Sequence, residues 1–196
     1  SLRRQRQMCI RDRIKMTRYI FTLILFSFIQ ITNSSASVTV IGDTDAARCY
    51  NHAKQGFSSR SSINICLSSL SEKPSVEANV FATRVNLGII YNNSRKPNLA
   101  LEQFNIAIKY ESFKAETLLN QGNSLYLLND FTGALAKYDE ALENNIRDIS
   151  SAYFNKGLVF EKMGNKQDAV LFYKKAVSIN PDLMIRFDER IRLDKS

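Results

Sequence analysis

Small and aromatic residues recur between residues 81 and 181 with a period of 34 or 35 residues. When the glycines at 88, 122 and 157 are aligned, three further columns fall into register. Those columns are Ala100, Ala134 and Ala169; Phe104, Tyr138 and Tyr173; and Ala107, Ala141 and Ala176. A fixed period of this length is typical of proteins built from stacked structural repeats. The pattern therefore predicts three similar units in series.

Within each unit the pattern predicts two antiparallel helices. In the third unit, apolar residues at helical spacing predict one helix over Ala152–Lys162 and a second over Gln167–Ser178. Gly164 and Asn165 between them indicate a turn, and Asn180-Pro181 ends the second helix. We expect the small residues where two helices approach closely and the aromatic residues in the space beside them. One such hairpin cannot bury its apolar face alone, so stability should come from stacking.

The columns resemble the tetratricopeptide repeat, whose period is 34 residues and whose pattern combines aromatic, Gly, Tyr, Ala and Pro positions. The third unit, AYFNKGLVFEKMGNKQDAVLFYKKAVSINP, matches almost throughout, although Lys156 replaces a Leu. Leu118 and Arg84 stand at the aromatic position of the other two units. The resemblance implies an all-α fold, a right-handed superhelical α-solenoid of helix-turn-helix repeats. Its repeats would cover residues 81–114, 115–149 and 150–181.

Two further segments flank these repeats. Residues 43–74 are predicted to be a degenerate helical hairpin at the N-terminal end, in which Cys49 and Cys66 face each other. Once Cys9, which lies in an adapter-like N-terminal run described below, is set aside, these two cysteines remain. We expect a disulfide between them, because an even number of cysteines is typical of exported proteins. The alternative is two buried free thiols. Residues 182–196 alternate charged and apolar side chains, which predicts a C-terminal capping helix.

The N-terminal residues are interpreted as an export signal behind a non-native leader. The run Ser1–Arg13 resembles a translated sequencing adapter, so residues 1–15 are left out of the fold. Residues 16–36 have the form of a signal peptide, with an apolar stretch over Tyr19–Ile31 and small residues after it. We expect cleavage after Ala36, or otherwise after Ser37. The alternative is a retained membrane anchor, although 13 apolar residues are few for a span of about 20.

The charge distribution changes the choice of partner. The chain has a formal charge of +8, but residues 1–37 alone contribute seven basic residues and one acidic residue. The remainder is nearly neutral and lacks the clustered basic surface that nucleic-acid binding requires. We therefore expect no nucleic-acid partner. The signal predicts an exported protein, periplasmic in the first place and secreted in the second.

The resemblance also implies a peptide-binding groove lined by the first helix of each repeat. An asparagine recurs in this helix at positions 86, 120 and 155, and in some members of the family such asparagines bind the backbone of an extended peptide. The alternative is that they serve only helix packing. The expected lining is Val85, Asn86, Ile89 and Asn92 in the first repeat, Leu119, Asn120, Asn123 and Tyr126 in the second, and Phe154, Asn155, Leu158 and Glu161 in the third.

The groove positions are mainly apolar. Val85 stands where family members that bind acidic tails have a Lys, and Leu119 and Phe154 are its equivalents. We therefore expect an extended polypeptide ligand with apolar side chains, from an envelope or secreted protein. The alternative for these three residues is core packing.

The sequence offers little chemistry for catalysis. The lone His52 has no obvious carboxylate partner, no nucleophile–base set is recognisable, and two cysteines with one histidine are too few for a usual metal site. We therefore expect a non-enzymatic interaction scaffold without a cofactor or metal. The alternative is a structural protein that self-associates into homo-oligomers through the same groove.

Overall fold

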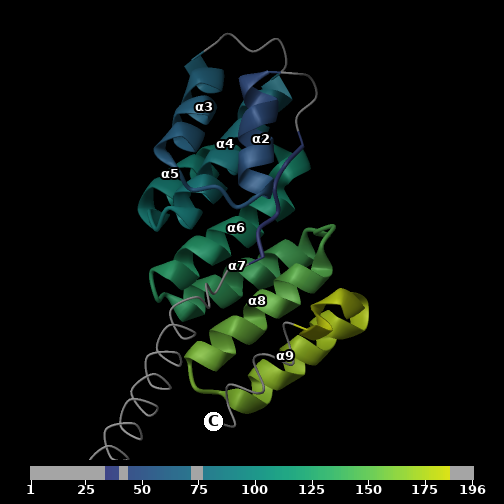
Figure 1. The fold of residues 1–196 in the computed structure, drawn as a ribbon. Helices are drawn as coiled ribbons and strands as arrows, with labels where there is room; N and C mark the ends of the chain where they lie inside the picture. Colours follow the sequence, from purple (N-terminus) through teal and green to yellow (C-terminus); the bar gives the residue numbers. More distant parts are fainter. Residues whose placement is uncertain (1–33, 40–43, 72–76, 186–196) are drawn as a thin grey trace, which may run out of the picture. The chain divides into compact units, whose positions relative to one another are not determined.

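The computed structural model describes residues 34–39, 44–71 and 77–185 (Figure 1). The adapter-like run and most of the predicted signal peptide lie outside these residues. Most of the predicted capping helix lies outside them too: a short 3₁₀ turn, Pro181–Leu183, is described at its start. The described residues therefore include the predicted hairpins and the six residues 34–39 that precede them.

The described part of the chain is all-α, which confirms the predicted α-solenoid of helical hairpins. Its helices pack as consecutive antiparallel pairs, and each pair contacts the next. Within each hairpin we call the first helix A and the second helix B. The helices are α2 (Asp45–Lys54), α3 (Arg60–Ser71), α4 (Glu77–Asn93), α5 (Pro97–Ala107), α6 (Lys114–Leu127), α7 (Phe131–Glu143), α8 (Ile149–Lys162) and α9 (Lys166–Ile179).

The helix boundaries follow from local chemistry. Asp130, Asp148 and Asn165 each accept a hydrogen bond from a backbone N–H three residues later, which caps α7, α8 and α9. In the third repeat α8 begins at Ile149, three residues before the expected start, because Asp148 is the residue that caps it. Pro97 begins α5 without a side-chain cap. A proline is tolerated there because the first N–H of a helix has no partner inside the helix.

The turns inside the three repeats share one geometry. Arg95, Asn129 and Gly164 adopt left-handed backbone angles, with φ of 58°, 63° and 77°. In each turn the next residue donates its N–H to a carbonyl five residues earlier, as from Lys96 to Tyr91 at 2.9 Å. This pattern satisfies the last carbonyls of a helix and reverses the chain. The 34- and 35-residue period therefore extends to the backbone of the turns.

Two of the recurring columns meet inside each repeat. A Cβ atom added to Gly88, Gly122 or Gly157 would lie 2.3–2.5 Å from the ring of the aromatic residue sixteen positions later. Those rings belong to Phe104, Tyr138 and Tyr173 on the B helices, and all three are almost completely buried. Glycine is needed at this point because the B-helix ring occupies the volume that any side chain would take.

The Lys156 departure from the repeat pattern has a local explanation. The ammonium group of Lys156 pairs with Asp139 on the preceding helix α7. It also lies 4.6 Å from the centre of the Phe172 ring. One residue before the glycine of the second repeat, Gln121 makes the equivalent contact, a 2.9 Å hydrogen bond to Asn105 of α5. In the second and third repeats this column therefore joins the A helix to the repeat before it.

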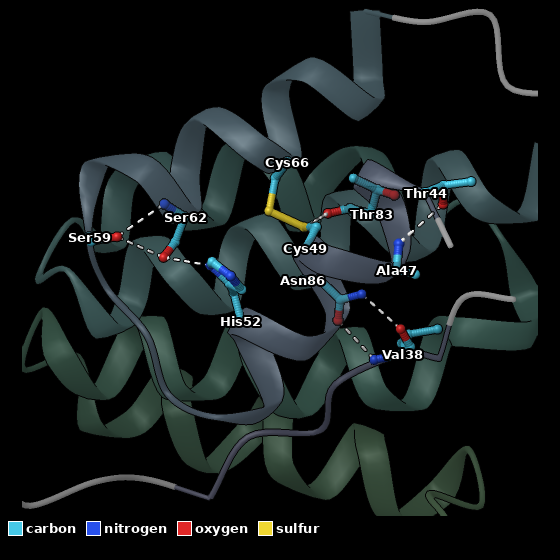
Figure 2. Close-up of a disulfide and its surroundings, with 10 residues drawn as sticks. All are labelled: Val38, Thr44, Ala47, Cys49, His52, Ser59, Ser62, Cys66, Thr83 and Asn86. Carbon is cyan, nitrogen blue, oxygen red and sulfur yellow. Dashed lines mark hydrogen bonds between the residues drawn. A yellow bond between two sulfur atoms is a disulfide. The ribbon is translucent and has the colours of Figure 1, made fainter. Parts of the chain in front are cut away.

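The first hairpin, α2 and α3, is joined differently. Cys49 and Cys66 lie opposite each other with an S–S distance of 2.04 Å and a Cα–Cα distance of 4.9 Å (Figure 2). His52 on α2 contacts Ser62 on α3 at 2.9 Å between Nδ1 and Oγ. Both helices contact α4 of the first repeat. The hairpin therefore packs against the A helix of the first repeat.

Candidate functional site

A short extended segment, residues 34–39, lies across the A helices of all three repeats. It is drawn in purple in Figure 1 and passes α4, α6 and α8. Its side chains alternate in exposure toward its C-terminal end, where Val38 is 2 % exposed and Thr39 is exposed. Alternation of this kind is typical of an extended backbone with one side against a surface.

The segment is held mainly by four asparagines, Asn86, Asn120, Asn123 and Asn155, which we call the asparagine ladder. Each is at most 1 % exposed. Their side-chain amides make six hydrogen bonds to backbone groups of alternate residues of the segment. Because the partners are backbone groups, this recognition does not depend directly on the segment's side chains.

The first rung binds Val38 at both of its backbone groups. The Val38 N–H donates to Asn86 Oδ1 at 2.9 Å, and Asn86 Nδ2 donates to the Val38 carbonyl at 2.7 Å (Figure 2). The Val38 side chain belongs to the same apolar cluster as Val85 and Ile89 of α4 and Cys49 of α2. This rung therefore combines a two-point backbone contact with burial of a β-branched side chain.

The middle and last rungs continue the pattern toward the N-terminal end of the segment. Asn120 Nδ2 donates to the Ala36 carbonyl at 2.9 Å. Asn155 exchanges two hydrogen bonds with Ser34, at 3.1 Å from the Ser34 N–H and 3.0 Å to its carbonyl, and Asn123 donates to that carbonyl at 2.8 Å. Successive rungs thus meet residues 38, 36 and 34, so the segment runs from the third repeat toward the first.

The ladder is fixed in orientation by a second set of contacts. Asn123 Oδ1 accepts from Asn155 Nδ2 at 2.8 Å and from the Tyr138 hydroxyl at 2.9 Å. Burial, and secondarily the nearby Tyr126, raises the pKa of the Tyr138 phenol well above its ordinary value. The phenol therefore stays protonated and donates, which leaves the Asn123 amide group to face the segment.

The remaining residues of the predicted lining lie in different surroundings. Asn92 is buried and accepts from the Ser124 hydroxyl at 2.9 Å, which joins α4 to α6. Tyr126 is 8 % exposed, with its ring 6.1 Å from that of Phe131. Glu161 is exposed and accepts from the Tyr173 hydroxyl at 2.5 Å. Each of these three contacts another residue of the repeats.

The apolar members of the predicted lining are all in the interior. Their exposed fractions are between 0 and 2 %. This burial includes the cover that the segment provides, since Val38 belongs to the same apolar cluster as Val85 and Ile89. The residues concerned are Val85, Ile89, Leu119, Phe154 and Leu158. Contact with the bound backbone is instead polar, through the ladder.

Sequence reasoning did not find the occupant itself. Residues 34–36 were assigned to the end of a signal peptide, and nothing in their composition indicates a binding segment. The only available hint was an apolar–polar alternation too short to interpret, since the contacts join residues 48 to 121 positions apart.

Other kinds of site have no support in the part of the chain that the structure describes. Within it, no three His, Cys, Asp or Glu side chains are grouped so that they could hold a metal ion. None of its helices combines the length and apolar character that crossing a bilayer requires.

Comparison with known proteins agrees with the fold of helical hairpins. Two family models, both described as tetratricopeptide repeat, match residues 85–149 and 150–183. Among solved structures, the crystal structure of MamA is similar, with a TM-score of 0.53 and 22 % identity. The alignment covers 72 % of this chain and 77 % of that one, and at this identity it supports the fold alone. A search of curated protein sequences gives no match.

Proposed function

Since residues 85–183 of this chain are tetratricopeptide repeats, we propose that the protein is a non-enzymatic scaffold that binds an extended polypeptide along its A helices. Repeats of this family are typical of protein–protein interaction. One observation carries the finer proposal: the asparagine ladder makes six hydrogen bonds to the backbone of an extended segment. A second polypeptide of the same conformation would offer it the same groups.

The energetics favour backbone recognition at this place. Each ladder amide is buried, and a buried amide without a partner costs about 1–3 kcal/mol. An extended ligand supplies a carbonyl or an N–H every second residue on one side, which matches the observed contacts at residues 34, 36 and 38. The ladder is thus selective for an extended backbone over a helix, whose carbonyl and N–H groups are already paired.

We also propose that the protein works outside the cytoplasm, in the periplasm or after secretion. The signal-like residues 16–36 support this proposal, and so does the Cys49–Cys66 pair, because disulfides persist in oxidising compartments. The test is the oxidation state of the two thiols in protein isolated from cells under alkylating conditions. Complete alkylation of both cysteines would contradict the proposal.

Peptide binding to the full chain tests the main proposal. The site must first be cleared, and Val38→Asp does this because a carboxylate is unfavourable in the apolar cluster. A fluorescent peptide NSSASVTV, the chain's own sequence around the segment, is then titrated and its anisotropy recorded. We expect saturable binding, weakened at least tenfold by the further substitutions Asn120→Leu and Asn155→Leu, which remove three hydrogen bonds worth about 1 kcal/mol each.

Asn93→Leu is the matched control, because Asn93 ends helix α4, is exposed and makes no hydrogen bond to the segment. The same substitution there should leave the affinity unchanged. Saturable binding that is insensitive to the two ladder substitutions, with circular dichroism showing folded protein, would contradict the proposal.

A further inference from the structure

The binding site of the proposed function is already occupied by the chain itself. Within the compact unit of residues 34–196, the segment fills every rung of the asparagine ladder. It precedes α2 directly in the chain, since only residues 40–43 separate it from Thr44, the N-cap of that helix. The occupant is therefore attached to the hairpin that adjoins the first repeat.

We propose that residues 34–38 are a resident ligand that closes the ladder in cis, and that a second polypeptide binds only by displacing them. The inference rests on the proposed function and adds the class of ligand. The ligand is an extended segment with small residues at its first and third positions and a β-branched apolar residue at its fifth, the pattern of Ser34, Ala36 and Val38.

The contacts define this class by position. Ser34 and Val38 each exchange two hydrogen bonds with one asparagine, while Ala36 receives one. The fifth position fits a buried apolar side chain, since Val38 is 2 % exposed in the cluster beside Ile89. Ser35 and Thr39 are exposed, so the second and sixth positions can vary.

The tether makes self-occupation efficient. A short connection along the chain gives an attached segment an effective concentration on the order of millimolar. Consider a free peptide that binds the cleared site with a micromolar dissociation constant. The attached segment competes with it at an effective concentration far above that constant. Its apparent affinity falls in proportion to the small fraction of open molecules.

The predicted signal cleavage would bear directly on this arrangement. A cut after Ala36 removes Ser34 and Ala36, the two residues that contact Asn120, Asn123 and Asn155. Val38 would remain at Asn86. Export would therefore release the second and third repeats for another polypeptide.

The test compares three forms of the uncleaved full chain: wild type, Val38→Asp and Thr39→Asp. Thr39→Asp carries the same charge one residue away on the exposed side, so it is the matched control. Binding of the NSSASVTV peptide is measured by anisotropy. We expect Val38→Asp to bind at least tenfold more tightly than the other two.

Amide hydrogen exchange supplies an independent measurement on the same proteins. The N–H groups of Ser34 and Val38 donate to Asn155 and Asn86, so both should be protected in wild type and in Thr39→Asp. In Val38→Asp the Ser34 N–H should exchange at least tenfold faster. Light scattering over a hundredfold range of concentration should show a monomer.

Each of the other outcomes contradicts a specific part of the proposal. Equal affinity in all three forms overturns self-occupation and leaves peptide binding standing. No binding to Val38→Asp, with protection intact in wild type, makes the segment a fixed part of the fold and overturns both proposals. Protection that rises with concentration together with a dimer overturns closure in cis, because the occupant then comes from a second copy.

Discussion

The A helices of the three repeats, α4, α6 and α8, each carry two recurring columns that lie on opposite sides of the helix and have different roles. The asparagine and the glycine of a repeat are two residues apart, as in Asn120 and Gly122, which rotates them by about 200° around the helix. Gly122 lies against the Tyr138 ring of its own repeat, while Asn120 binds the backbone of residue 36. Both columns recur equally, so recurrence alone does not separate residues that hold a repeat together from residues that bind.

The two columns differ physically in the kind of partner that they need. The glycine side is closed by an aromatic ring that its own repeat supplies. The asparagine side consists of buried amides whose remaining hydrogen-bonding groups need a partner from outside the helices. A buried polar column is therefore a better indicator of a binding surface than a buried apolar one.

The largest expected effect concerns the first hairpin, where a cysteine pair links the two helices. Cys49→Ala combined with Cys66→Ala should lower the free energy of unfolding by about 3 kcal/mol, because the bridge closes a loop of 17 residues. Urea denaturation followed by circular dichroism measures it. A reductant should lower the free energy of unfolding of the wild type to that of the variant and leave the value for the variant unchanged. Equal stability of both proteins without reductant would show that the bridge contributes nothing.

Gly122→Ala addresses the glycine side. The added Cβ would lie 2.4 Å from the Tyr138 ring, so overpacking should lower the free energy of unfolding by about 2 kcal/mol. Exchange protection of the Val38 N–H should be unchanged, because this group donates to Asn86 of the first repeat, whereas the Tyr138 hydroxyl donates to Asn123 of the second. In a Tyr138→Leu background the same substitution should cost less, because the ring it meets is gone, and a double-mutant cycle measures this difference. Loss of protection at Val38 would mean that the two sides are not independent.

Asn86→Leu addresses the opposite side. The substitution removes both hydrogen bonds to Val38, so exchange at that N–H should accelerate and the free energy of unfolding should fall by about 2 kcal/mol, about 1 kcal/mol for each bond. Asn93→Leu on the same helix is the control and should alter neither quantity. A fall in stability with unchanged exchange at the Val38 N–H would assign the asparagine to helix packing after all.

The smallest expected effect lies in the turns, which touch neither column. Arg95 has a φ of 58°, a conformation that glycine adopts more readily, so Arg95→Gly should raise the free energy of unfolding by roughly 0.5 kcal/mol. Asn129→Gly should raise the free energy of unfolding by less, because asparagine adopts the left-handed conformation more readily than arginine does. A loss of stability in both variants would contradict this account of the turn.

Much of the fold could be predicted because its determinants are local and repeated. The period located the hairpins, and turn residues such as Gly164 located their connections. The boundary of α8 was missed by three residues because capping by Asp148 decided it rather than apolar spacing. Of the predicted lining, the asparagine column and the apolar residues such as Leu119 and Phe154 each had two open interpretations, binding or packing. The sequence could not choose between them, because the choice depends on what lies against these side chains in the folded chain.

By itself the sequence determined the repeat, the all-α solenoid and the recurrence of an asparagine two residues before each glycine. These follow from helix periodicity and from side-chain size, which act over a few residues. Only the tertiary structure decided what meets the asparagines. The segment of residues 34–39 makes no regular pattern of its own, and its hydrogen bonds join it to residues up to 121 positions away. Its placement depends on three A helices already stacked in register, so the complementary groups exist together only after folding.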